Sequence, residues 1–255
     1  MAVEDETWNK IVRALAPFGL DLSVYKPGQI KRRLETFLNQ EGFATVDALT
    51  RALTQSPDLY RKLHGHLTIH VTEFFRDRPY WLQLRSVISH ERLQVPWAVW
   101  SAGCSWGAEP VTAALIFEDM GQPYSILATD SDGDILTTAR TGRYLDEQYR
   151  KVPPPYGRFF ERDGDAWRLV GLSHGTITYR QHNLTAEFPP QQYNVVVCRN
   201  VLIYFEPAVR LRVLRAFADA LTPRGLLFLG VTETFLEYAD LGFRMISPSL
   251  YQKAD

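Results

Sequence analysis

The first 70 residues place hydrophobic side chains at the three- and four-residue spacing of amphipathic helices. The pattern is interrupted at Lys26-Pro27-Gly28 and again at Gly42, and Ser56-Pro57 is typical of a helix start. We therefore predict a small all-helical domain over residues 1–70. The positions that carry the pattern are Trp8, Ile11, Val12, Leu15, Phe18, Ile30, Leu34, Phe37, Leu38, Leu49, Leu53, Leu59 and Leu63.

From residue 97 onward, short apolar runs alternate with helical patterns, which favours a mostly parallel sheet. We predict an α/β fold with a Rossmann-like sheet over residues 93–255, and we expect residues 71–92 to link it to the helical domain. The expected strands are 97–102, 124–129, 176–181, 193–198, 225–231 and 243–252, and the expected helices are 109–119, 132–141 and 207–221.

The stretch from about residue 144 to 175 is too long for a simple loop between a helix and a strand. Within it, Asp163-Gly164-Asp165 is typical of a tight hairpin turn. We expect an inserted subdomain with a small β-hairpin, and the flanking Arg162 and Ala166 leave little room for a longer hairpin loop.

The stretch WAVWSAGCSWGAEP, residues 97–110, predicts a buried strand, a turn of small residues and the first turn of a helix. Small side chains let a ligand approach the backbone, and a helix N-terminus offers unpaired N–H groups. The next predicted strand ends in Asp130, where an acidic residue can bind ribose hydroxyls. The turn lacks the full G-x-G-x-x-G pattern, so a tight turn that binds nothing is the alternative.

Two further stretches carry polar residues at predicted domain or strand ends. Arg199 and Asn200 directly follow an apolar strand, where residues line the ligand crevice of an open α/β sheet, although Arg199 could instead cap a helix. The linker contains Thr72-Glu73-Phe74-Phe75-Arg76. Its aromatics could simply pack in a core, Thr72 could cap a helix, and Arg76 could pair with a neighbouring carboxylate.

Lys31, Arg32 and Arg33 form a basic cluster on the second predicted helix, with Lys26 just before it. Such a cluster is either a solvated helix face or a docking surface for an acidic protein segment.

Composition narrows the remaining functions. The 255 residues carry a formal net charge of −1, which argues against a nucleic-acid-binding surface. Cys104 and Cys198 are the two cysteines, and we interpret them as reduced core residues of a cytoplasmic protein. The acidic N-terminus does not resemble a signal peptide, and no apolar run reaches membrane-spanning length. His64, His66 and His70 do not form a convincing metal site, and we expect none.

The motifs together resemble those of the chemotaxis receptor methyltransferase (CheR) family. They follow the family order over nearly the whole chain: TEFFRDRPYW, VWSAGCSWGAEP, ILATDSD, RQHNL, VVVCRNVLIYF and FLGVTETF. The resemblance implies a class I methyltransferase that transfers methyl from S-adenosylmethionine to glutamates of chemoreceptors, leaving S-adenosylhomocysteine. It also implies that the partner is the cytoplasmic helical domain of these receptors, and nothing in the sequence indicates an obligate dimer.

The family resemblance assigns roles to individual positions. It implies that Arg76 and Tyr204 are catalytic and that the helix with Lys31, Arg32 and Arg33 docks the receptor. The positions that it implies for cofactor binding are His70, Thr72, Arg76, Ala108, Glu109, Asp130, Asn183, Leu184, Arg199 and Asn200.

Three positions depart from the family pattern: His70 stands where Asn is usual, Trp106 where Thr is usual, and Ala108 where Glu is usual. A missing carboxylate at position 108 removes a charge-assisted hydrogen bond to the cofactor, typically about 1.5–3 kcal/mol. Trp106 adds bulk where the backbone should approach the ligand. The alternative function is therefore a catalytically weakened regulator that binds cofactor or receptor. A methyltransferase for small molecules or RNA is a third hypothesis, against which the basic helical domain and the near-zero net charge argue.

Overall fold

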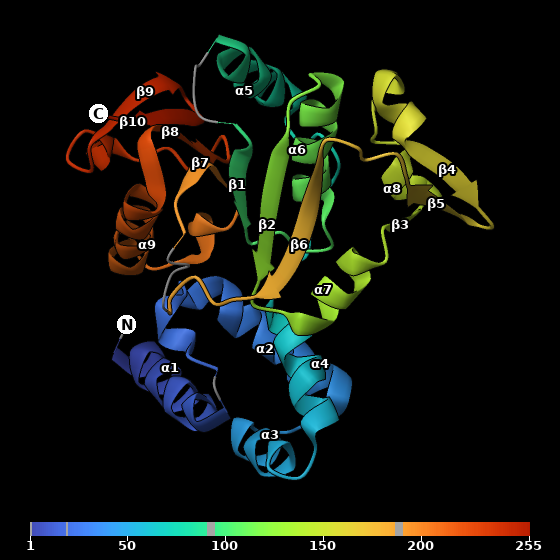
Figure 1. The fold of residues 1–255 in the computed structure, drawn as a ribbon. Coiled ribbons are helices and arrows are strands. Elements are labelled where there is room, and N and C mark those ends of the chain that lie inside the picture. Colours follow the sequence, from blue (N-terminus) through green and yellow to red (C-terminus); the bar gives the residue numbers. More distant parts are fainter. Residues whose placement is uncertain (1, 19, 91–94, 187–190) are drawn as a thin grey trace. The chain divides into compact units, whose positions relative to one another are not determined.

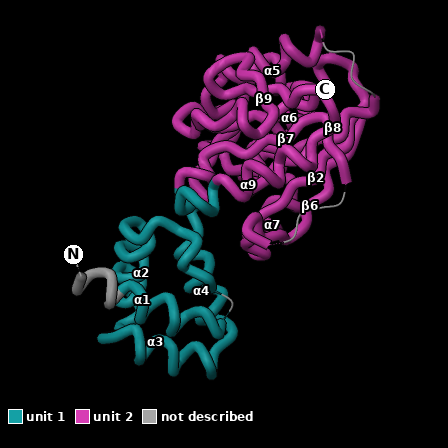
Figure 2. The backbone as a smooth tube through the Cα atoms, turned by 90° about the vertical axis from the view of Figure 1, so that its left-hand side faces the viewer, with its two compact units in different colours: residues 1–69, 204–210 teal, residues 70–203, 211–255 magenta. Residues whose placement is uncertain are grey.

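The computed structural model describes residues 2–18, 20–90, 95–186 and 191–255, with side chains from residue 8 onward. The chain folds into two compact units, one made of residues 1–69 and 204–210 and the other of residues 70–203 and 211–255 (Figure 2). The return of 204–210 to the N-terminal unit was not predicted, because the sequence places these residues inside the α/β domain.

The N-terminal unit is helical, as its periodicity predicts. Its core consists of the apolar stripe read from the sequence, with Leu15, Leu34 and Leu63 all essentially inaccessible to solvent. Its elements are α1 (Ala2–Leu15), η1 (Ala16–Phe18), η2 (Leu22–Val24), α2 (Pro27–Glu41), α3 (Val46–Leu53) and α4 (Pro57–Leu67). None of the helices that the structure describes, here or in the second unit, has the length and apolar character of a membrane span.

Local signals explain where these helices begin and end. Pro27 occupies the first turn of α2, where its missing N–H costs nothing, and Gly42 ends the helix with φ 75°. The Ser56 hydroxyl accepts a hydrogen bond from the Leu59 amide at 3.2 Å and so caps α4. The breaks seen in the sequence are therefore the helix boundaries.

The second unit is built on a mostly parallel sheet, drawn in green, orange and red in Figure 1. In the described residues, the strand order is β6-β2-β1-β7-β8-β10-β9, with β10 antiparallel to both neighbours. Its strands are β1 (Trp97–Ala102), β2 (Tyr124–Asp130), β6 (Gly175–Gln181), β7 (Tyr193–Cys198), β8 (Leu221–Leu229), β9 (Phe243–Ser247) and β10 (Leu250–Lys253). The α/β prediction is confirmed, and β1 and β7 have the predicted bounds.

The helices that follow the N-terminal unit along the chain include α5 (Arg78–His90), α6 (Ala108–Asp119), α7 (Gly133–Arg140) and α9 (Pro207–Ala220), with η4 (Leu202–Tyr204) and η5 (Leu236–Tyr238). Tyr204 of η4 and residues 207–210 of α9 belong to the first unit. The helices α5 and α6 share one hydrophobic core with β1, β2, β7 and β8. Thr72 does not cap a helix, because α5 begins only at Arg78.

Two strand predictions were wrong in detail. β8 begins at Leu221 rather than 225, because Leu221 pairs with Tyr193 before a bulge in the register, and Arg224 adopts φ 60° there. The predicted strand 243–252 is an antiparallel hairpin of β9 and β10, which turns at Pro248 and Ser249 between the paired Ser247 and Leu250. Proline favours such a turn because its φ is fixed.

The insertion predicted near 144–175 is a separate small sheet, drawn in yellow in Figure 1. Its elements are β3 (Arg143–Leu145), α8 (Asp146–Tyr149), η3 (Pro154–Phe159), β4 (Phe160–Asp163) and β5 (Ala166–Leu169), and the strand order within the described residues is β3-β5-β4. Asp163 pairs with Ala166, so Gly164 and Asp165 form the hairpin loop, with Gly164 at φ 65°. The short hairpin is confirmed, whereas β3 was not predicted.

Candidate functional site

The carboxyl ends of β1, β2 and β7 bring the small-residue turn, Asp130 and Arg199 to one edge of the sheet. β1 lies between β2 and β7 and runs parallel to both. The small-residue turn follows β1, Asp130 ends β2, and Arg199 follows β7. This edge is where open α/β sheets bind ligands.

Glycines in the turn after β1 permit close packing. Gly103 has φ 82°, and a Cβ atom there would lie 2.6 Å from Val201 Cγ2. Gly107 has φ 94°, and its Cβ would lie 3.0 Å from the Tyr179 hydroxyl. A larger residue at either position would strain the backbone. At position 103 it would also displace Val201 in the loop after β7, and at position 107 it would displace Tyr179 of β6.

Asp130 fixes the same turn through its carboxylate. Its Oδ2 accepts a hydrogen bond from the Ser105 amide at 2.8 Å, and its Oδ1 accepts one from the Asp132 amide at 3.0 Å. A carboxylate has about four acceptor positions, so both oxygens can still accept a ribose hydroxyl. Burial raises the pKa of Asp130, and the two amides oppose that shift.

Glu109 is buried in the first turn of α6. The Ser101 hydroxyl donates to its Oε1 at 2.7 Å. Burial raises the pKa of Glu109 to about 7, although the charge of Arg199 and the Ser101 hydrogen bond both lower it. A cationic group beside this carboxylate would favour its ionised form.

Arg199 connects the end of β7 to the linker before α5. Its Nη1 donates to the Arg76 carbonyl at 2.7 Å, and its Nη2 forms a 2.7 Å ion pair with Asp77. The guanidinium lies over Trp81 and Phe228, with centroid distances of 5.5 and 4.9 Å. The alternative that Arg199 caps a helix is therefore replaced by a role in holding the linker.

Several buried polar atoms at this edge lack a hydrogen-bond partner among the described residues: Ser105 Oγ, Arg199 Nε and Asn200 Oδ1. Buried polar groups in folded proteins are nearly always hydrogen-bonded, so a polar ligand at this edge would satisfy them. Together with the Asp130 and Glu109 carboxylates, they fit a ligand that carries hydroxyl, amino and carboxylate groups.

His70 also reaches this edge. Its Nε2 lies 2.9 Å from Asp132 Oδ2, and the other Asp132 oxygen accepts the Asp134 amide at 2.9 Å and so begins α7. The hydrogen bond from His70 is the main reason that the pKa of Asp132 falls to about 2. His70 therefore pairs with Asp132, which lies two residues after Asp130.

The other predicted cofactor residues differ in their surroundings. Thr72 is half-buried, and Arg76 Nη1 donates to the Val71 carbonyl at 3.0 Å. Leu184 is buried, whereas the exposed Asn183 accepts the Thr185 amide at 2.9 Å in a local turn. Thr72, Arg76, Asn183 and Leu184 all belong to the second unit.

Ala108 and Trp106 pack into the hydrophobic core. Ala108 is fully buried at the start of α6. The Trp106 ring is 9% exposed and lies against Phe74 and Tyr144, at centroid distances of 5.4 and 5.9 Å. The sequence suggests that Trp106 adds bulk where the backbone should approach the ligand, and in the structure its indole packs into an aromatic cluster.

The two cysteines are free and buried. Burial is the main reason that the pKa of each thiol is raised well above its usual value. Because the thiolate is the nucleophilic form, neither cysteine suits covalent catalysis, and both serve as core residues as predicted.

Tyr204 and the basic helix belong to the first unit. The Lys26 amide donates to the Tyr204 carbonyl at 2.9 Å, and the Glu206 amide donates to the Val24 carbonyl at 2.9 Å. Tyr25 and Phe205 form the bridge between these bonds. The backbone of 204–206 therefore pairs with the chain just before α2.

The three basic residues of α2 have different surroundings. Arg33 donates from Nε to the His66 carbonyl at 2.7 Å and from Nη2 to the Thr68 carbonyl at 2.9 Å, so it ends α4. Lys31 Nζ lies 5.7 Å from the Trp8 ring centroid, and Arg32 is exposed. Of the three predicted docking residues, Arg33 thus uses its guanidinium for hydrogen bonds within the helical unit.

Sequence reasoning missed several residues of the site: Ser105, Asp132 and Glu233. Asp132 is the first residue of the predicted helix 132–141, and an aspartate at a helix start could have marked it as the cap that it forms on α7. The other two act through contacts that join residues far apart in the chain, and no local pattern reports them.

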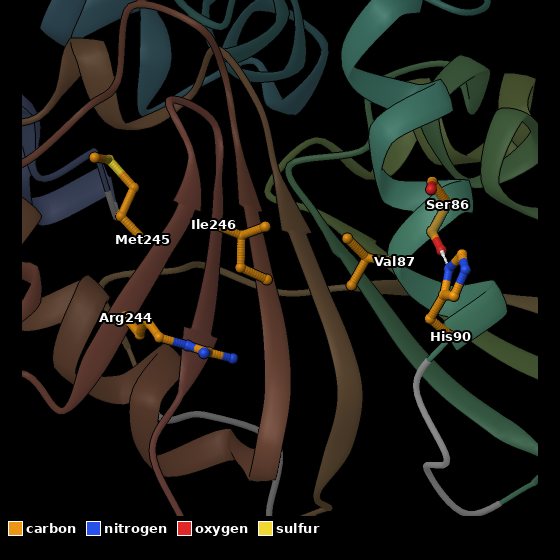
Figure 3. A pocket seen from close by; sticks show the side chains of 6 residues that line it. All are labelled: Ser86, Val87, His90, Arg244, Met245 and Ile246. Carbon is orange, nitrogen blue, oxygen red and sulfur yellow. Dashed lines mark hydrogen bonds between the residues drawn. The ribbon is translucent and has the colours of Figure 1, made fainter.

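A separate hollow lies between α5 and β9, and it contains none of the predicted site residues. Figure 3 shows Val87 of α5 opposite Ile246 of β9, and the His90 ring turned toward Ser86, to whose carbonyl its Nδ1 donates at 2.7 Å. The lining residues are Ser86, Val87, His90, Arg244, Met245 and Ile246.

The family models match the chain in two parts. Residues 14–68 match the all-alpha domain of CheR methyltransferase, and residues 70–249 match its SAM-binding domain. The chain belongs to the CheR methyltransferase family. Its cofactor is S-adenosylmethionine, and the unpartnered polar atoms and acidic side chains at the sheet edge fit this molecule.

Curated relatives agree with this membership. The chain is 34% identical to a chemotaxis protein methyltransferase of Listeria innocua over 242 residues, which covers 92% of each protein. It is 33% identical to that of Listeria monocytogenes with the same coverage. The Escherichia coli K12 chemotaxis protein methyltransferase is 29% identical over 236 residues, with 85% of this chain and 80% of that protein covered.

Replacing Asp130 by Ala should abolish cofactor binding at ordinary concentrations. The substitution removes an ionised acceptor of two ribose hydroxyls, each worth about 1.5–3 kcal/mol, so affinity should fall at least about a hundredfold. Calorimetric titration with S-adenosylhomocysteine measures this loss. Asp134→Ala removes an equal charge from the exposed face of α7 and is the control. Unchanged affinity of folded Asp130→Ala would refute the site.

Cofactor affinity should rise with pH up to about 7 and level off above it. The pKa of Glu109 is raised to about 7 in the ligand-free protein, and a bound amino group favours the ionised carboxylate, so binding releases a proton. At pH 6 only about one tenth of Glu109 is ionised, and affinity for S-adenosylhomocysteine should be about tenfold lower than at pH 8. Glu109→Gln should flatten the profile. An equally steep profile in Glu109→Gln would show that another group titrates.

Proposed function

We propose that this methyltransferase transfers the methyl group of S-adenosylmethionine to glutamate side chains of chemoreceptors, forming methyl esters. The observation that carries the proposal is the match of both parts of the chain, helical and SAM-binding, to one family. The names of the curated relatives place such enzymes in chemotaxis. The receptor and its glutamates are the substrate that the sequence resemblance implies.

The residues of the site suit this chemistry. The cofactor supplies an electrophilic methyl on a sulfonium sulfur, and a glutamate carboxylate, already ionised at neutral pH, attacks it without a general base. Asp130 and Glu109 would bind the ribose and amino groups, while Arg199 holds the linker that carries Arg76. What remains for the protein is to align the reacting groups and exclude water.

Arg76 and Tyr204 are the residues that we assign to the reacting end. The Arg76 guanidinium uses Nη1 on the Val71 carbonyl and has further N–H groups that can orient a carboxylate. The backbone at Tyr204 is fixed by its pairing with residues 24–26. This pairing joins the Tyr204 segment to the chain that leads into α2.

Receptor docking is assigned to the exposed face of α2. Arg32 is exposed, and Lys31 is half-buried near Trp8, so these two can meet acidic receptor helices. Arg33 contributes only indirectly, because its guanidinium binds the end of α4. Surface ion pairs of this kind are worth about 0–1 kcal/mol each and are screened by salt.

Methyl transfer distinguishes this proposal from a regulator that has lost catalysis. The experiment combines titration with S-adenosylhomocysteine and transfer of tritiated methyl to receptor-rich membranes. Binding and transfer together support the proposed enzyme. Binding without transfer would select the regulator, and the absence of both would refute each assignment.

Charge reversal at Arg32 should reduce receptor methylation without changing cofactor affinity. Arg32→Glu replaces an attraction to acidic helices by a repulsion, and we expect about a threefold to tenfold loss of initial rate at low salt. The loss should shrink as ionic strength rises. Arg51→Glu makes the same change at an exposed arginine of α3 and is the control. Equal rates for Arg32→Glu and wild type would contradict docking by α2.

Receptors truncated at the C-terminal tail should be methylated as fast as intact receptors. The β4–β5 hairpin has the short loop Gly164–Asp165, which leaves little extra edge for a tail peptide to extend as an added strand. Initial rates on matched membranes with intact and truncated receptors measure this. A strong loss on truncation would show that the small sheet captures the tail.

A further inference from the structure

Glu233 is a fully buried carboxylate just beyond the end of β8. Burying a carboxylate is costly unless hydrogen bonds replace its water. Burial accordingly raises the pKa of Glu233, and hydrogen bonds from backbone amides oppose the shift. The function proposed above assigns this residue no role.

The donors to Glu233 come mainly from the loop after β7. Oε2 accepts the Asn200 amide at 2.6 Å, and Oε1 accepts the Val201 amide at 2.8 Å and the Ile203 amide at 3.3 Å. The Gly230 amide donates to Oε2 at 2.7 Å. One side chain on the β8 loop therefore satisfies successive amides of the loop that carries Arg199 and Asn200.

The loop needs such an anchor. Asn200 adopts φ 61°, a left-handed conformation that asparagine tolerates better than other non-glycine residues but that remains uncommon without contacts that favour it. Its side-chain Oδ1 is buried without a partner among the described residues, so it can accept a ligand group. Small rotations about the Asn200 backbone would swing this atom away from the sheet edge.

Gly230 makes room for the anchor. A Cβ atom at Gly230 would lie 2.6 Å from Glu233 Oε2 and 2.9 Å from the Asn200 amide nitrogen. An alanine there would therefore press directly on the hydrogen bond between the two. Gly230→Ala disturbs this contact without removing the carboxylate.

We propose that Glu233 is a positioning residue for the cofactor site. It holds the 199–203 loop in the one backbone conformation that aims Asn200 at the cofactor. The inference rests on the proposed function and on the family resemblance, which implies that Arg199 and Asn200 bind the cofactor.

Glu118 provides a matched control within the same unit. It is also a buried carboxylate, in the last turn of α6, and it accepts the backbone amides of Ser173 and His174, both at 2.9 Å. Tyr124, at the start of β2, donates its hydroxyl to the same oxygen. Glu118 thus anchors a loop at the amino ends of β2 and β6, the edge opposite the site. Glu118→Gln and Glu233→Gln make the same chemical change.

The experiment measures melting temperature, S-adenosylhomocysteine affinity and amide hydrogen exchange for wild type, Glu233→Gln, Gly230→Ala and Glu118→Gln. Both glutamine variants lose stability because an amide nitrogen replaces an acceptor oxygen. Glu233→Gln and Gly230→Ala should weaken affinity about tenfold or more and speed exchange at residues 200–203. Glu118→Gln should speed exchange at 173–174 and leave affinity within about twofold of wild type.

Wild-type affinity in folded Glu233→Gln would overturn the proposal, as would equal affinity losses in Glu233→Gln and Glu118→Gln at matched loss of stability. If Glu233→Gln does not fold, Glu233→Asp replaces it, and the shorter carboxylate should weaken affinity and speed exchange at 200–203. Wild-type affinity in Glu233→Asp would then overturn the proposal. Failure of wild type itself to bind would refute the proposed function instead.

Discussion

Buried carboxylates that accept backbone N–H groups hold the carboxyl edge of the sheet in shape. Asp130 fixes the turn after β1 through the Ser105 amide, and Asp132 begins α7. Glu233 holds the loop after β7. Such charge-assisted bonds are shorter than neutral ones and roughly twice as strong. Each loop of the site is thus held by a carboxylate that accepts its backbone amides.

This construction leaves an acidic and partly unsatisfied site. Burial raises the pKa of Glu109, Asp130 and Glu233, which shows that the ionised forms are costly in the ligand-free protein. A cofactor that carries a sulfonium, an ammonium and hydroxyl donors offsets that cost. Arg199 supplies a balancing positive charge, yet it is bound to Asp77 and to the Arg76 carbonyl. This arginine therefore joins the end of β7 to the linker before α5.

The sequence predicted the parts of the fold that follow from local pattern. β1 and β7 are mostly apolar runs buried on both faces, each with one polar residue, and their bounds matched. The start of β8 was missed because Leu221 belongs to the sheet through its pairing with Tyr193, a contact that periodicity does not report. The split of 243–252 into β9 and β10 was missed because the turn occupies only Pro248 and Ser249.

The position of Asp130 at the end of β2 was predicted, because the end of an apolar run marks it in the sequence, and its role in binding ribose stays a prediction. Roles that depend on a distant partner were not predicted. In the sequence, Arg33 is indistinguishable from Arg32, yet it binds carbonyls at the end of α4. Trp106 stands in a ligand-binding turn, yet its ring packs on Phe74. Charge and size in a sequence do not specify the direction of a side chain.

The most direct test of the account is the chemical stability of the transferred methyl group. Receptor-rich membranes are labelled with tritiated S-adenosylmethionine by this enzyme, and the labelled protein is treated with mild alkali. Carboxyl methyl esters hydrolyse and release volatile methanol, whereas methyl groups on nitrogen or sulfur stay bound. The account predicts that nearly all label is released as methanol and that Asp130→Ala yields no label. Alkali-stable label would contradict glutamate as the acceptor.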